Sequence, residues 1–104
     1  MTHAVFERKN GRLCAVSVTG HAEYADAGED VVCAAVSSAV QLSANLITDT
    51  FRDEAGVKAE DNLIGITLKG QAGNGSAVLN GLCDHLQYLS EDYPGTIQIQ
   101  ITEV

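Results

Sequence analysis

The sequence predicts an α/β fold, a two-layer sandwich in which two helices pack on one face of a mixed sheet, in the order ββαββαβ. Three observations predict it. An Asn-Gly dipeptide joins two strand-like runs, two longer segments repeat apolar residues about once per helical turn, and the last run alternates isoleucine with polar residues. The chain has 104 residues, which suffice for one core and therefore for one domain, residues 1–104.

The first two predicted strands are His3 to Glu7 and Leu13 to Thr19. Asn10-Gly11 between them is typical of a type I′ hairpin turn. Both faces of this hairpin carry apolar residues, so we expect one face to meet the core and the other to be covered by a partner or a loop. The turn predicts three facing pairs: Lys9 with Arg12, Val5 with Val16, and Phe6 with Ala15.

The first predicted helix begins near Asp30, which is a favoured N-cap residue, and ends before Gly56. The stretch from Val31 to Thr48 contains no charge, but serine, glutamine and asparagine recur through it, which favours a buried helix with a polar stripe over a membrane span. The expected apolar stripe of this helix is Val32, Val36, Val40, Ile47 and Phe51.

The second half of the sequence repeats the strand–strand–helix order. Val57 to Glu60 and Leu63 to Lys69 are predicted strands joined by a turn at Asp61-Asn62. A second helix is predicted from an N-cap at Ser76 to about Asp92. The last strand follows, with Ile97, Ile99 and Ile101 on one face and Gln98 and Gln100 on the other.

Composition and charge favour some classes of function and disfavour others. The net charge is -8, so direct binding to nucleic acid is not expected, whereas a basic protein or peptide would be attracted. Solubility alone explains the same charge. The charged fraction of 19% is low and favours an oligomer that hides part of the surface. No signal-peptide core is evident, and the odd number of cysteines, 3, favours a reducing compartment. We therefore expect a cytoplasmic protein that does not associate with a membrane.

The residues that could perform chemistry are a cysteine and a histidine. Cys33 is predicted in the first turn of its helix, where unpaired backbone N–H groups favour a thiolate and can bind an oxyanion. His21 follows Gly20 at a strand end, a common position for a catalytic group. The loop between them can bring the pair together and cover a substrate, with Gly28 as a hinge.

Other uses of these residues remain open. A lone cysteine is often a buried small residue, and Cys14 and Cys83 fit that description. No C-x-x-C, zinc-ligand spacing or glycine-rich phosphate loop is present, so neither a metal nor a cofactor is expected.

The run from Gly20 to Ser37, GHAEYADAGEDVVCAAVS, resembles the signature of the ribosomal-processing cysteine proteases, and the resemblance covers essentially the whole chain. It implies a homodimeric cysteine endopeptidase that removes the N-terminal extension of a large-subunit ribosomal protein. Two other classes stay open: a non-catalytic binding module in ribosome assembly, and a cysteine-dependent hydrolase of another acyl or amide substrate. It implies that His21 and Cys33 form the catalytic dyad. The positions expected to support the dyad or to contribute to the substrate loop are Gly20, Tyr24, Gly28, Asp30, Ala34 and Ser37.

The mechanism implied by this resemblance is acyl transfer, in which His21 deprotonates Cys33 and helix N–H groups bind the oxyanion. Asp30 has two possible roles: it either orients His21 or only caps the helix. The loop from Ala22 to Glu29 is expected to be mobile, to close over an extended peptide and to recruit a basic substrate through its acidic residues.

Overall fold

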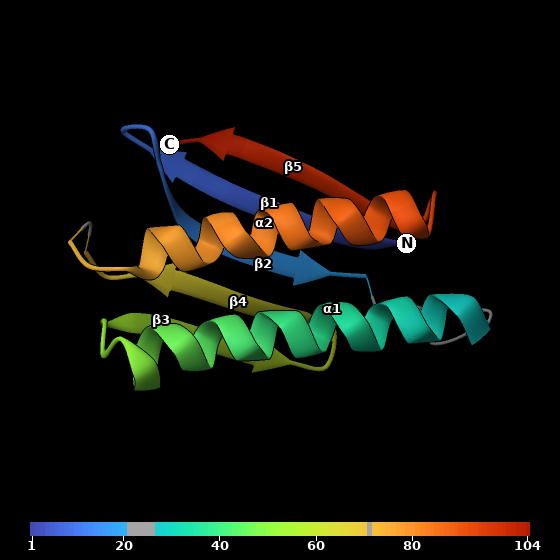
Figure 1. The fold of residues 1–104 in the computed structure, drawn as a ribbon, viewed down its shortest axis with the longest axis horizontal. Helices are drawn as coiled ribbons and strands as arrows, with labels where there is room; N and C mark the ends of the chain where they lie inside the picture. The colour runs from blue at the N-terminus through green and yellow to red at the C-terminus, as the bar shows by residue number, and fades with distance from the viewer. Residues whose placement is uncertain (21–26, 71) are drawn as a thin grey trace.

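The computed structural model describes residues 1–20, 27–70 and 72–104. The elements in the described part of the chain are β1 (Thr2–Lys9), β2 (Arg12–Thr19), α1 (Ala27–Asn45), a π-helical turn (Leu46–Thr50), β3 (Ala55–Glu60), β4 (Leu63–Leu68), α2 (Gly75–Asp92) and β5 (Ile97–Glu103). The strands lie in the order β3-β4-β2-β1-β5, with β1 and β5 parallel and the other pairs antiparallel. Both helices cover the same face of this mixed sheet (Figure 1). The predicted fold class is confirmed.

The first hairpin has the predicted turn but a shifted register. Asn10 and Gly11 both have positive φ, 54° and 79°, as a type I′ turn requires, and Lys9 pairs with Arg12. A bulge between Glu7 and Arg8 then leaves Cys14 as the extra residue on β2. The other two predicted pairs are therefore wrong: the observed pairs are Val5 with Ser17 and Phe6 with Val16.

The core lies between the helices and the sheet. The predicted stripe of α1 is confirmed at Val32, Val36, Val40 and Ile47, all of which are buried. Phe51 is 43% exposed and does not belong to the stripe, because the helix ends in the π-helical turn before it. The other large buried side chains are Phe6, Ile66, Leu79 and Leu86.

One helical segment in the described part of the chain, Val31–Thr50, is long and apolar enough to cross a membrane by length and composition alone. A helix in a protein core passes the same test. Here the valine stripe of the segment packs into the core, and the buried Ser43 donates its hydroxyl hydrogen to the Ala39 carbonyl at 2.8 Å. One face of the segment therefore packs in the core, while 33% of the segment is buried in total and its other face is exposed, as at Leu42.

α1 begins one turn earlier than predicted. Its first residue is Ala27, so Asp30 lies inside the first turn and is not the N-cap, and Cys33 lies in the second turn. Ala27 and Glu29 favour helix at least as well as the residues after them, so a good capping residue at position 30 does not stop the helix from extending toward the N-terminus. Gly28 is also inside the helix and not in the loop where a hinge was predicted.

α2 is capped by a residue from another part of the chain. The N-cap position is Asn74, whose own side chain makes no cap hydrogen bond, and Ser76 is a buried residue of the first turn, so the predicted Ser76 cap is wrong. Instead, the carboxylate of Asp53 accepts hydrogen bonds from the backbone N–H groups of Asn74 at 2.7 Å and Gly75 at 3.0 Å. This contact ties the segment after α1 to the start of α2.

Candidate active site

Cys33 lies half-buried on α1, at the end of the sandwich that also contains the end of β2. Ser37 follows it by one helical turn and therefore shares its face of the helix. The two residues line one small cavity, so the structure brings these two predicted site residues together. Ala34 is exposed and lies outside this lining. The other described residues that line the cavity are Thr2, Val18, Thr19, Val36 and Ile64.

Thr2, at the start of β1, contacts the candidate nucleophile directly. Its hydroxyl oxygen Oγ1 lies 3.7 Å from Sγ of Cys33, within hydrogen-bond range for sulfur. The Thr2 residue is 5% exposed, and its backbone N–H donates to the Thr96 carbonyl at 2.9 Å. Sequence analysis did not identify Thr2, because 31 positions separate it from Cys33 and no local pattern connects them.

Gly20 follows the last residue of β2 and immediately precedes the candidate base, His21. Its φ is +100°, and a Cβ atom at this position would lie 2.3 Å from the carbonyl oxygen of Met1. Only glycine fits both the backbone conformation and the close approach. The residue that precedes His21 therefore lies against the start of β1, next to Thr2.

Some of the remaining predicted site residues lie outside the described residues, and others lie in α1. His21, Tyr24 and the acidic part of the loop, residues 21–26, lie outside the described residues, so the predicted pairing of His21 with Cys33 stays a prediction. Gly28 and Asp30 are placed in the first turn of α1. The predicted N-cap position of Asp30 is therefore wrong, and its role as a third catalytic residue stays a prediction.

The position of Cys33 in the second turn of α1 changes what the start of the helix can contribute to it. The unpaired N–H groups of a helix belong to its first four residues. Cys33 is in the second turn, where its own N–H is used inside the helix, and the effect of the helix dipole falls off after the first turn. The amide of Cys33 is therefore not available to bind an oxyanion, and its thiolate gains less from the helix than the sequence predicted.

The other two cysteines are poorer candidates for a nucleophile. Cys83 is 5% exposed in the core, and burial, with the nearby charge of Asp84 as a smaller cause, raises the pKa of its thiol and so disfavours the thiolate. Cys14 is the bulged residue of β2 and donates its S–H to the Glu7 carbonyl at 3.5 Å. It is half-buried and not the core residue that was predicted, because the bulge displaces it.

In the described residues 1–20, 27–70 and 72–104, no group of three or more histidine, cysteine, aspartate or glutamate side chains could hold a metal ion. The described residues that line the cavity of Cys33 are apolar or carry hydroxyl groups.

Cys33 and Cys14 are both partly accessible thiols beside a cavity, and Cys33 is the one that lies in the sequence motif of the candidate dyad. The sequence model of the family described as Cysteine protease Prp matches residues 1–98, and this chain belongs to that family. It is therefore a cysteine protease, a hydrolase.

Solved structures show the same fold. SMU.848 from Streptococcus mutans aligns with a TM-score of 0.80 and 25% identity over 100% of this chain and 96% of that chain. The ribosomal processing protease Prp from S. aureus, in complex with a substrate peptide, aligns with a TM-score of 0.90 and 21% identity over 98% of this chain and 100% of that chain. The same S. aureus protease with a covalently linked product peptide aligns at 0.84 and 22% identity, with the same coverage of both chains. No curated protein matches the chain.

Proposed function

We propose that this cysteine protease is an endopeptidase that removes the N-terminal extension of a large-subunit ribosomal protein, with Cys33 as nucleophile and His21 as general base. The observation that carries the proposal is the position of Cys33, half-buried beside a cavity at the edge where the chain continues from Gly20 into His21. The S. aureus relative is a ribosomal processing protease that was solved with a substrate peptide, which supports the same class of substrate here.

The proposed reaction proceeds in two steps of acyl transfer. His21 takes the proton of the Cys33 thiol, and the sulfur attacks the scissile carbonyl carbon to form an S–C bond. The C–N bond then breaks, and His21 returns its proton to the departing amine. In the second step water attacks the thioester, assisted by His21 as base, and releases the carboxylate product together with the free thiol. The product peptide linked covalently to the S. aureus relative is consistent with this kind of chemistry.

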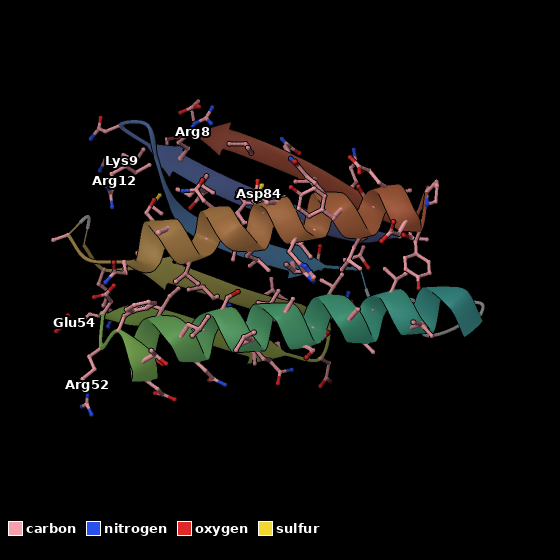
Figure 2. The ribbon with its side chains drawn as sticks, in the orientation of Figure 1. Arg8, Lys9, Arg12, Arg52, Glu54 and Asp84 are labelled. Carbon is pink, nitrogen blue, oxygen red and sulfur yellow. The ribbon has the colours of Figure 1, made fainter. Side chains whose placement is uncertain are left out.

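Charge distribution supports a basic substrate. We define the Cys33 end of the sandwich by the start of β1, the β3–β4 turn and the end of α2. This end exposes acidic side chains from the β3–β4 turn and from the end of α2. These residues are Glu60, Asp61, Glu91 and Asp92, of which Glu60 pairs with Lys58 at 3.4 Å. Arg8, Lys9, Arg12 and Arg52 lie at the opposite end (Figure 2), where Glu103 pairs with Arg8 and Glu54 also lies. A basic peptide would therefore be attracted to the end of the molecule that carries the nucleophile.

We further propose that the protein is a homodimer in the cytoplasm. A groove between α1 and α2, on the surface of the helix layer away from the sheet, is lined mainly by small and apolar side chains, and Leu42 at this groove is 60% exposed. Together with the low charged fraction, this surface supports association of two copies. A Leu42→Glu variant that stays dimeric by light scattering would argue against this face as the contact.

The proposed substrate is tested by incubating the protein with the ribosomal-protein precursor of its own host and measuring the products by intact mass. We expect one cut that removes the N-terminal extension.

Neutralising Glu91 and Asp92 to Gln and Asn should lower kcat/KM at low salt and have little effect at about 0.15 M, where screening is strong. The matched control is Asp84→Asn on the middle of the same helix (Figure 2). A precursor that stays intact while a short acyl ester is hydrolysed would favour the alternative hydrolase.

A further inference from the structure

Thr2 is a buried polar residue whose side chain has one hydrogen-bond partner among the described residues. Its hydroxyl lies 3.7 Å from Sγ of Cys33, and either atom of this pair can be the donor. The Thr2 residue is 5% exposed, so water does not readily replace this partner. A buried hydroxyl that lacks a partner is costly, so the contact constrains both side chains.

The backbone holds Thr2 rigidly in this position. Its N–H bonds to the Thr96 carbonyl, it pairs with Ile97 of β5, and a Cβ atom at Gly20 would come within 3.4 Å of its Cα. The side chain is β-branched and therefore has few accessible rotamers. Thr2 can thus present its hydroxyl to the Cys33 sulfur at little further cost in entropy.

Among the described residues, Thr2 is the side chain with a hydrogen bond to the sulfur. Cys33 lies beyond the free N–H groups of the first turn of α1. The other described residues that line its cavity are Val18 and Thr19 of β2, Val36 and Ser37 of α1, and Ile64 of β4, and none of these carries a charge. A hydroxyl that donates a hydrogen bond to a thiolate stabilises its negative charge.

We propose that Thr2 is a positioning residue for the nucleophile, because its hydroxyl accepts a hydrogen bond from the Cys33 thiol and donates one to the thiolate. The proposal rests on the proposed function, in which Cys33 is the nucleophile. The hydroxyl rotates between the two roles, so it holds the sulfur in one place before and after proton loss and makes the reactive form easier to reach.

The test measures the rate of alkylation of Cys33 by iodoacetamide as a function of pH, read by peptide mapping so that Cys14 and Cys83 do not contribute. Thr2→Val keeps the shape of the side chain and removes the hydroxyl. We expect its profile to move about one pH unit higher, with about tenfold slower alkylation at pH 7, because one unit corresponds to a tenfold change in thiolate fraction. Thr2→Ser should return the profile toward that of the parent.

The test includes one control variant and one replacement for Thr2→Val. Thr67→Val removes a hydroxyl from an exposed position of β4 and should leave the profile unchanged. Thr2→Ala removes the same hydroxyl with less bulk and replaces Thr2→Val if that variant fails to fold. A folded Thr2→Val or Thr2→Ala protein whose profile superimposes on that of the parent would overturn the proposal.

Cleavage of the precursor separates this proposal from the proposed function. If the parent cleaves and the hydroxyl-free variants lose kcat in proportion to their alkylation rate, both proposals stand. If the parent fails to cleave while the alkylation profile still depends on Thr2, the substrate assignment is wrong and the role of Thr2 at the sulfur holds. If the parent cleaves and the variants match it in kcat and in alkylation, Thr2 does not position the nucleophile.

Discussion

Gly20 lies directly against the carbonyl oxygen of Met1, with room for hydrogen but not for a Cβ atom. This contact joins the end of β2 to the start of β1, at the place where Thr2 meets Cys33. It gives a packing reason for a glycine immediately before the candidate base. A larger residue at position 20 would have to displace the backbone that carries Thr2.

Gly20→Ala should therefore lower both stability and activity. Its positive φ alone costs about 1 kcal/mol for a residue with a side chain, and the 2.3 Å approach to a backbone atom adds to this, so we expect a loss of about 2 kcal/mol or more. Gly11→Ala is the matched control, because Gly11 also has positive φ but no atom within 4 Å of the added Cβ. Urea unfolding measures both variants, and equal losses would show that the contact with Met1 has no cost.

The cap of α2 by Asp53 predicts a stability effect far from the cavity of Cys33. Asp53→Ala removes the acceptor of two backbone N–H groups and should cost about 1–2 kcal/mol in the free energy of unfolding. Asp49→Ala is the control, since its carboxylate accepts only the hydroxyl of the neighbouring Thr48 among the contacts found in the described residues. If thermal unfolding shows the same midpoint for both variants, the remote cap does not stabilise the helix.

The raised pKa of the Cys83 thiol predicts that the free energy of unfolding falls at alkaline pH. Burial, helped by Asp84, raises the pKa of this thiol in the folded protein. Between the unfolded value of about 8.5 and the raised folded value, the unfolded chain binds fewer protons, so the free energy of unfolding falls as pH rises. The contribution of Cys83 is complete below about pH 8.5 and disappears as pH passes the folded-state value. Denaturation from pH 7 to 10 should give a shallower decline for Cys83→Ala, and parallel curves would contradict the assignment.

Periodicity and turn chemistry predicted most of the fold. The valine stripe of α1 and the Asn10-Gly11 turn are local patterns that act within a few residues, and both have the predicted outcome. The alternation in β5 holds at Ile97, which is buried, whereas Ile101 is 39% exposed. The bulge at Cys14 was not predicted, because an extra residue in a strand leaves no mark on composition. It changes which residues face the helices, and it places Phe6 opposite Val16.

The site was predicted less completely than the fold, for the same physical reason. A sequence motif marks Cys33 and His21, and it gives Gly20 without explaining it. The contacts that surround the sulfur come from residues distant in the sequence, such as Thr2, and can be found only once β1 and α1 are packed. The start of α1 was misplaced because Ala27 and Glu29 also favour helix, and this error moved Cys33 by one turn.

The central claim, that Cys33 is the nucleophile of a peptidase, is tested most directly by trapping the acyl-enzyme. The protein is mixed with its precursor substrate, quenched in acid within the first turnover and analysed by intact mass and peptide mapping. We predict a transient adduct with the mass of the acyl half of the substrate on the peptide that contains Cys33. Cys33→Ala should show neither adduct nor cleavage, and His21→Ala should form the adduct about 10²–10⁴-fold more slowly. Cys14→Ala should behave as the parent does. Cleavage by Cys33→Ala, or an adduct that maps to another residue, would contradict the account.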